Sequence, residues 1–125
     1  MATPTSSWAV LEGRALWNGE PLSYWANVLA ADLAVEFGPE EIWLFGSVAR
    51  GDDTGDSDLD LLVVLDSYDP TTAIELKQRA LRATEAPAPF DVAFTDVNRL
   101  ATLQQIAGTL ERAVLLDGRC LYRRG

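Results

Sequence analysis

The fold is set by the run Gly46-Ser47-Val48-Ala49-Arg50-Gly51-Asp52-Asp53-Thr54-Gly55-Asp56-Ser57-Asp58-Leu59-Asp60. It follows the apolar residues Ile42-Trp43-Leu44-Phe45 and precedes Leu61-Leu62-Val63-Val64-Leu65. Both apolar runs are typical of buried strands. The sequence therefore predicts a polar, glycine-rich loop between two buried strands, and this loop ends in paired carboxylates.

The two carboxylates, Asp58 and Asp60, open the second apolar run. Alternate side chains of a strand share a face, so these carboxylates would stand ~6.6 Å apart along the backbone. Oxygen ligands at this spacing suit a magnesium ion that carries nucleotide phosphates. The alternative is a solvated turn beside a strand edge. Because unpaired carboxylates are costly at the start of an apolar strand, the metal interpretation is favoured.

A short helix is predicted directly after the first strand, over residues 47–50. The N–H groups at its start carry partial positive charge and suit a phosphate group, and the Ser47 hydroxyl adds a further donor. The alternative is that Gly46 and Ser47 form only a strand-to-helix turn, with Ser47 as the cap. Both interpretations remain open from these residues alone.

A third carboxylate, Asp91, lies in a segment that alternates as a strand, residues 90–95. Phe90, Val92 and Phe94 would share one face of this strand, and Asp91 would lie on the other. If the strand pairs with residues 58–65, Asp91 comes next to Asp58 and Asp60. Three such carboxylates repel one another without cations, which favours two metal ions. The alternative for Asp91 is a solvated residue at a strand start.

Length and composition limit the possible functions. The 125 residues suffice for one domain with a proper core. Histidine is absent and Cys120 is the only cysteine, which excludes an internal disulfide, Ser-His-Asp and Cys-His nucleophiles and the usual zinc sites. The net charge of −9 argues against direct binding of long nucleic acid, which depends on lysine and arginine. Without a signal segment or an apolar run of the ~20 residues that a membrane helix needs, we expect a cytoplasmic protein with no membrane contact.

The remaining segments alternate between helix and strand patterns. Helices are predicted over residues 21–37, 73–84 and 97–116, with Gly108 as a break in the last, and residues 120–122 are expected to return as a strand. On the second helix, the predicted apolar stripe consists of Ala73, Ile74, Lys77, Ala80, Leu81 and Thr84. Core candidates in the last segment are Leu100, Leu103, Ala107, Leu110 and Val114. The predicted fold is α/β (α+β), a small mixed sheet with helices packed on it.

The sequence resembles the nucleotidyltransferase superfamily named for DNA polymerase β. The resemblance lies in the Gly-Ser pair, the Asp-x-Asp pair, the apolar strand that follows it and a later strand with Asp91. The similarity is closer to its minimal nucleotidyltransferase branch and extends over residues 23–122. It implies a polymerase-β-like palm fold for residues 21–125. Residues 1–20 form an arm outside the match. The tryptophans of this arm would pack on the body of the same chain or form a dimer or partner contact.

The resemblance also implies a role for each site residue. Gly46 and Ser47 would hold the β- and γ-phosphates of a nucleoside triphosphate, ATP. Asp58 and Asp60 would bind two Mg²⁺ ions, and Asp91 would complete one site and help to deprotonate the incoming hydroxyl. Arg50 would support the triphosphate, although a surface salt bridge with a neighbouring aspartate is an equal alternative.

Members of this branch typically pair with a HEPN (higher eukaryotes and prokaryotes nucleotide-binding) ribonuclease toxin. The resemblance therefore implies an antitoxin that transfers AMP from ATP to a toxin tyrosine, in a homo- or hetero-oligomer. Two alternatives stay open. The chain would either neutralise a partner by binding alone or modify a small-molecule acceptor, as the aminoglycoside-modifying enzymes do.

Overall fold

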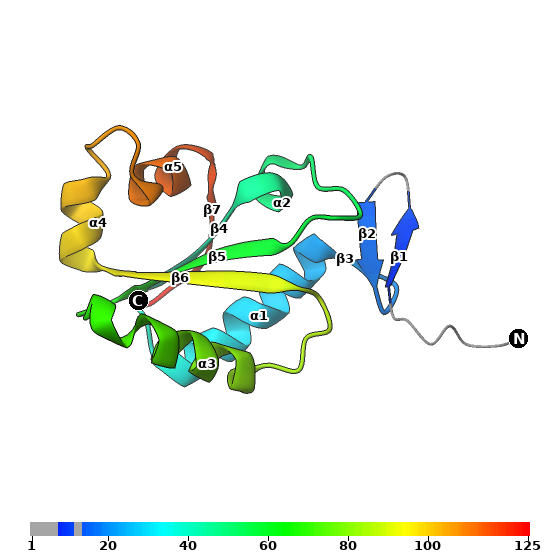
Figure 1. Ribbon diagram of the computed structural model, residues 1–125, viewed down its shortest axis with the longest axis horizontal. Coiled ribbons are helices and arrows are strands. Elements are labelled where there is room, and N and C mark those ends of the chain that lie inside the picture. The colour runs from blue at the N-terminus through cyan, green and yellow to red at the C-terminus, as the bar shows by residue number, and fades with distance from the viewer. Residues whose placement is uncertain (1–7, 12–13) are drawn as a thin grey trace, which may run out of the picture.

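The computed structural model describes residues 8–11 and 14–125 and shows a mixed four-stranded sheet with helices on both faces (Figure 1). The strand order is β6-β5-β4-β7, and a second sheet of three short strands is formed by the N-terminal residues. In chain order the elements are β1 (Trp8–Leu11), β2 (Arg14–Trp17), β3 (Glu20–Pro21), α1 (Leu22–Phe37), β4 (Glu41–Phe45), α2 (Gly46–Arg50), β5 (Leu59–Leu65), the 3-10 turn η1 (Pro70–Thr72), α3 (Ala73–Ala83), β6 (Phe90–Asp96), α4 (Val97–Leu103), α5 (Leu110–Asp117) and β7 (Arg119–Arg123).

The strand pairings confirm the predicted sheet. Strand β5 runs antiparallel to β4, with Phe45 opposite Asp60, and parallel to β6, with Asp60 opposite Asp91. The antiparallel pair β4–β5 is joined through α2 and the polar loop, whereas the parallel pair β5–β6 is joined by the crossover through α3. The predicted final strand is confirmed as β7, which pairs antiparallel with β4. The α/β prediction is therefore correct.

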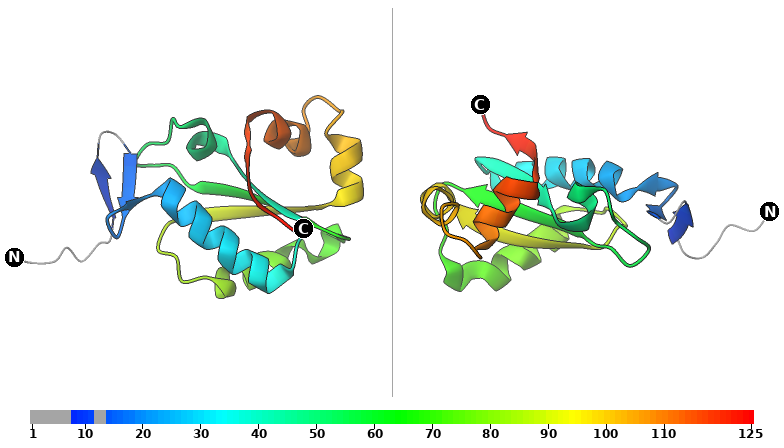
Figure 2. Two further views of the ribbon diagram at one scale, coloured as in Figure 1. Left: turned by 180° about the vertical axis from the view of Figure 1, so that it is seen from behind. Right: turned by 90° about the horizontal axis from the view of Figure 1, so that it is seen from above.

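Helices cover both faces of the sheet and create two apolar layers (Figures 1 and 2). Helices α1 and α3 cover the face that carries Leu59, Leu61 and Val63, and this layer forms the main core. Helices α4 and α5 lie on the other face, where Leu62 and Val64 pack with Val114. Because Asp60 and Asp91 alternate with main-core residues, both lie on the α4/α5 side of the sheet.

Two of the predicted apolar stripes are wrong in part. On α3, Ala80 is buried as predicted, but Ile74 and Leu81 are largely exposed, and Leu76 and Ala83 face the core in their place. The spacing of the residues allows more than one stripe on this helix, and the packing of α3 on the main core selects the buried one. In the last helical segment Val114 is buried as predicted, but Ala107 and Leu110 are exposed because the chain turns outward between α4 and α5.

The N-terminal arm forms the antiparallel sheet β1-β2-β3, in which Asn18 and Gly19 make the turn between β2 and β3 with positive φ angles. The indole Nε1 of Trp25 donates a hydrogen bond to the Trp17 carbonyl at 2.7 Å, and Trp17 packs against the main core. At Trp17, the arm therefore packs on the body of its own chain. None of the helices in the described part of the chain combines the length and the apolar character needed to cross a membrane.

Candidate active site

The start of α2 lies against the carboxylate of Asp60, and Gly46 makes this possible. Gly46 has a φ angle of +80°, and a Cβ built on it would overlap the Asp60 Oδ2 atom. The residue therefore has to be glycine for two reasons, the left-handed backbone and the close approach. This contact brings the Gly-Ser segment and the Asp-x-Asp segment, which the sequence analysis assigned to one site, into direct proximity.

Ser47 binds the polar loop that follows α2 through its side-chain hydroxyl. Its Oγ donates a hydrogen bond to Ser57 Oγ at 3.1 Å, and Ser57 Oγ also accepts one from the Thr54 backbone N–H at 2.7 Å. These bonds tie the loop ahead of Asp58 to the first turn of α2. The sequence analysis missed Ser57, and its position directly before Asp58 was the one available signal.

The β5–β6 register places two of the predicted site carboxylates side by side. Asp60 and Asp91 are direct neighbours across the parallel ladder, and Asp58 precedes Asp60 by two residues. Burial raises the pKa of the Asp60 carboxyl above its usual value, the Asp91 and Asp58 carboxylates raise it further, and the Arg50 guanidinium lowers it. Asp58 and Asp91 are therefore close enough to Asp60 to oppose its ionisation.

A lysine ammonium lies close to Asp91 in this arrangement. The Nζ atom of Lys77 on α3, the single lysine of the chain, is 3.6 Å from Asp91 Oδ1, and the Asp91 side chain is 68% exposed. Over residues 8–11 and 14–125, no three acidic, histidine or cysteine side chains converge closely enough to hold a metal ion. A side-chain rearrangement is therefore needed before all three carboxylates can share a cation.

The donor set nevertheless fits magnesium. All the oxygens are carboxylate oxygens, the ligand type that Mg²⁺ prefers. Burial and the two neighbouring carboxylates, Asp91 and Asp58, raise the pKa of Asp60, and a cation would relieve the repulsion among the carboxylates. The Asp91 side chain is 68% exposed, and its Oδ1 atom also accepts a hydrogen bond from the Val92 backbone N–H at 3.0 Å.

Arg50 forms the surface salt bridge that was one of the two alternatives considered for it. Its Nε atom lies 3.4 Å from Asp52 Oδ2, in an ion pair whose two side chains are about half exposed. The guanidinium is also close enough to Asp60 to lower its pKa. A surface ion pair of this kind is weak, so the guanidinium can exchange Asp52 for another anion at little cost.

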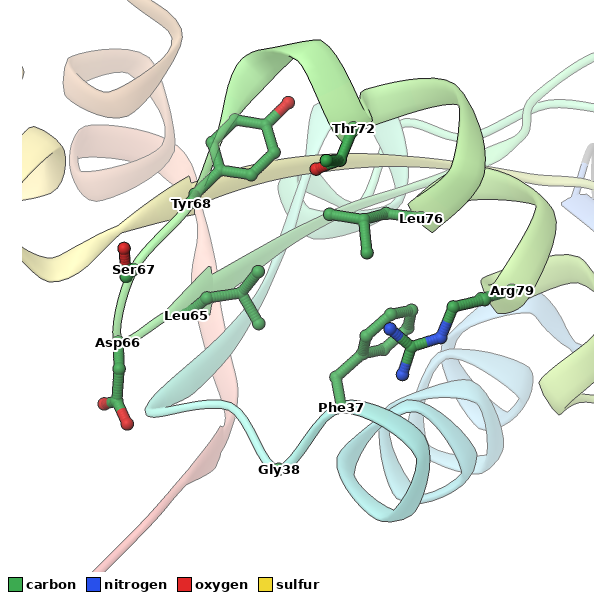
Figure 3. Close-up of a pocket in the computed structure, with 9 residues that line it drawn as sticks. All are labelled: Phe37, Gly38, Leu65, Asp66, Ser67, Tyr68, Thr72, Leu76 and Arg79. Carbon is green, nitrogen blue, oxygen red and sulfur yellow. The ribbon is translucent and has the colours of Figure 1, made fainter.

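A separate cavity of about 400 Å³ lies at the opposite end of β5 (Figure 3). Its lining includes Leu65, Tyr68 and Leu76, and the Arg79 guanidinium covers the Phe37 ring at 4.6 Å from the ring centroid. Asp58 and Asp60 lie at the start of β5, whereas this cavity surrounds its end, so none of the predicted site residues lines it.

Comparison with known proteins identifies the family and the fold. The family model described as polymerase beta, nucleotidyltransferase, matches residues 29–125. A protein from Sulfolobus solfataricus, provisionally assigned as a nucleotidyltransferase, is 23% identical with a TM-score of 0.56 over 79% of this chain and 78% of its own, and shows the same fold. A toxin–antitoxin structure with AMP-PNP is 25% identical with a TM-score of 0.51, and the match covers 78% of this chain and 73% of that one. No curated protein matches the chain at a significant level.

Proposed function

Because the chain belongs to the polymerase β nucleotidyltransferase family, we propose that it transfers AMP from ATP to a tyrosine hydroxyl of a cognate HEPN ribonuclease toxin and thereby acts as an antitoxin. One observation carries the chemical part of this proposal, namely the register that pairs Asp60 with Asp91 while Gly46 packs on Asp60. The similarity to a toxin–antitoxin structure with AMP-PNP supports the nucleotide and the kind of partner.

The carboxylates of Asp58, Asp60 and Asp91 would hold two Mg²⁺ ions. Magnesium, when bound, stabilises the negative charge that develops on the transferred phosphoryl group and on the leaving pyrophosphate. Asp58 and Asp91 are both exposed, whereas Asp60 is half-buried. Asp91 lies on the edge strand β6, where an incoming hydroxyl can reach it.

The reaction is a displacement at the α-phosphorus of ATP. The acceptor oxygen forms a bond to this phosphorus, the bond to the oxygen bridging the α- and β-phosphates breaks, and pyrophosphate leaves. Asp91 accepts the proton of the acceptor hydroxyl. The Gly46 backbone and the Ser47 hydroxyl hold the β- and γ-phosphates, and Arg50 exchanges its ion pair with Asp52 for the triphosphate.

The test is labelling of the partner. The purified chain is mixed with the product of the adjacent gene, magnesium and ATP labelled on the α-phosphate, and we expect the label on a tyrosine of the partner. The double variant Asp58→Asn/Asp60→Asn should give no label, whereas Asp117→Asn, the same change at an exposed position on α5, should label like the wild type.

Three outcomes distinguish the alternatives. Absence of label with the folded wild-type chain contradicts the proposed transfer. Continued neutralisation of the partner by the double variant identifies a non-catalytic antitoxin. Labelling of a free small molecule without any protein partner identifies a small-molecule nucleotidyltransferase.

A further inference from the structure

Ser57 closes the tight turn that leads into Asp58, in the loop that joins α2 to β5 (Figure 1). Its backbone N–H donates a hydrogen bond to the Thr54 carbonyl at 3.1 Å, and its Oγ atom accepts one from the Thr54 N–H at 2.7 Å. Polar side chains stabilise turns through local bonds of this kind. Both main-chain groups of Thr54 are thus bound to one residue, and the turn fixes the position of the Ser57 hydroxyl oxygen.

The Ser57 oxygen also contacts Ser47, to which the proposed reaction gives the β- and γ-phosphates of ATP. The two Oγ atoms lie 3.1 Å apart, although the residues are 10 positions apart in the chain, and both side chains are partly buried. Ser57 Oγ accepts from the Ser47 hydroxyl and from the Thr54 N–H, which uses both acceptor sites of a hydroxyl. Its own proton has no acceptor among the residues that the structure describes.

The two hydroxyl protons determine what this pair of serines can bind. A serine hydroxyl carries one proton, so Ser47 cannot donate to Ser57 and to a phosphate oxygen at the same time. Hydroxyl protons rotate about the C–O bond, so the hydrogen bond can also run in the opposite direction, with Ser57 donating its unused proton to Ser47. The two oxygens stay in contact, and the Ser47 proton becomes available to an anion.

We propose that Ser57 is a positioning residue for the triphosphate and acts through Ser47, an inference that rests on the proposed nucleotidyl transfer. When the nucleotide binds, the Thr54 N–H donates to Ser57, Ser57 donates to Ser47, and Ser47 donates to an oxygen of the β- or γ-phosphate. Hydrogen bonds that run in one direction polarise one another. Ser47 is therefore a stronger donor to the phosphate than a serine without this neighbour.

The loop that carries Ser57 is acidic, so the pair of hydroxyls supplies a donor where the loop has no basic residue. Residues 51–60 include the five aspartates Asp52, Asp53, Asp56, Asp58 and Asp60, and neither lysine nor arginine. Negative charge repels a triphosphate unless cations and hydrogen-bond donors offset it. A donor that is oriented before the nucleotide binds loses less side-chain entropy on binding. The Ser57 hydroxyl therefore orients its partner serine without adding charge to the site.

A purely structural role for Ser57 leads to a different expectation. Because Ser57 directly precedes Asp58, loss of its hydroxyl would then loosen the turn and displace that carboxylate. This effect would not depend on the hydroxyl of Ser47. Variants that remove the two hydroxyls singly and together therefore distinguish a role through Ser47 from a role through the turn.

Isothermal titration calorimetry with magnesium and a non-hydrolysable ATP analogue tests the proposal without any protein partner. Ser57→Ala should raise the dissociation constant about tenfold, because the donor to a charged phosphate is no longer held in place. Ser57→Thr keeps the hydroxyl and should bind within about threefold of the wild type. Ser67→Ala is the matched control, since Ser67 is exposed beyond the opposite end of β5, and it should bind like the wild type. Circular dichroism melts confirm that each variant is folded.

The decisive comparison is made in a Ser47→Ala background. There, Ser57→Ala should change the dissociation constant by less than about twofold, because the hydroxyl through which Ser57 acts is absent. A further loss of about tenfold would show that Ser57 acts through the turn, and it would overturn the proposal. A Ser57→Thr chain that binds as weakly as Ser57→Ala would do the same.

The calorimetry also distinguishes this inference from the proposed function. A wild type that labels its partner, together with a Ser57→Ala chain that binds the nucleotide normally, overturns only the role of Ser57. A folded wild type that binds no nucleotide in the presence of magnesium overturns the proposed nucleotidyl transfer itself, and the role of Ser57 with it.

Discussion

Gly46 shows how the absence of a side chain allows the candidate site to form. Its φ angle of +80° lies in a region that favours glycine, and the Asp60 carboxylate occupies the space of a Cβ. At Asp60 the effect is electrostatic, because burial and two neighbouring carboxylates all oppose its ionisation. At the residue scale, the site therefore depends on a close contact and on accumulated negative charge.

We expect Gly46→Ala to destabilise the fold by about 2–4 kcal/mol, from backbone strain plus the overlap with Asp60. AMP transfer should fall at least about 100-fold, since the carboxylate is displaced. Urea unfolding and the labelling assay measure the two effects. The control is Gly108→Ala, where φ is +89° and nothing lies within 4 Å of the added Cβ, so only strain is introduced. Equal losses of stability in the two variants would mean that the Asp60 contact is unimportant.

Asp60→Asn is expected to stabilise the metal-free protein at neutral pH by up to about 1 kcal/mol, because the repulsion it relieves is partly screened by solvent. A carboxyl group with a raised pKa binds its proton more tightly in the folded state. Its contribution to stability is therefore full below the unfolded pKa of about 3.9 and is lost as the pH rises through the folded pKa. Urea unfolding of both proteins at pH 7 and near pH 3.5 should show the difference at pH 7 only. A large destabilisation by Asp60→Asn at pH 7 would assign this residue a structural role.

At the level of elements, the parallel pairing of β5 with β6 aligns Asp60 and Asp91, and α5 is fixed against this pair by a buried polar contact. Thr95 of β6 is fully buried and donates a hydrogen bond from Oγ1 to Glu111 Oε2 at 2.9 Å. Glu111 itself is only 8% exposed. A buried carboxylate depends strongly on its donors, so this bond is important for the packing of α5.

Thr95→Val should therefore lower the free energy of unfolding by about 1–3 kcal/mol, because it removes a donor from a buried carboxylate. Glu111→Gln should cost less, since an amide oxygen still accepts the threonine hydrogen bond. Chemical unfolding at pH 7 measures both variants. Thr102→Val, at an exposed position on α4, is the control and should stay within about 0.5 kcal/mol of the wild type. If both threonine variants behave alike, the Thr95–Glu111 bond does not stabilise α5.

At the scale of the whole molecule, the sheet separates two surfaces. The α4/α5 face carries the carboxylates, and the opposite face is covered by α1 and α3. Binding of a nucleotide should be coupled to folding of the entire domain, because the site draws on β4, α2, β5 and β6.

Magnesium and ATP together should raise the melting temperature by several degrees, since a ligand at 100 times its dissociation constant stabilises a fold by about 2.7 kcal/mol. A non-hydrolysable analogue separates binding from turnover. Differential scanning calorimetry should show the shift for wild type and for Asp117→Asn, but not for Asp58→Asn/Asp60→Asn. An equal shift in the presence of EDTA would show that the nucleotide binds independently of these carboxylates and their metal.

The sequence by itself determined the strands of the four-stranded sheet and the main helices, whereas the pairing of β5 with β6 was only a condition in the sequence analysis and was decided by the fold. Apolar runs and alternating faces are local signals, and a crossover through a helix joins parallel neighbours. The roles of Gly46, Ser47, Arg50, Asp58, Asp60 and Asp91 stay predictions, although the structure brings Asp60 against both Gly46 and Asp91.

Only the tertiary structure decided which contacts these elements make. It selected the buried face of α3, tied Ser57 to Ser47, set Lys77 beside Asp91 and buried Glu111 against Thr95. Except for the loop contact of Ser47 with Ser57, each of these depends on elements that meet only after the chain has folded back on the sheet. Side-chain spacing records the period of a single element but not the direction from which its neighbour approaches.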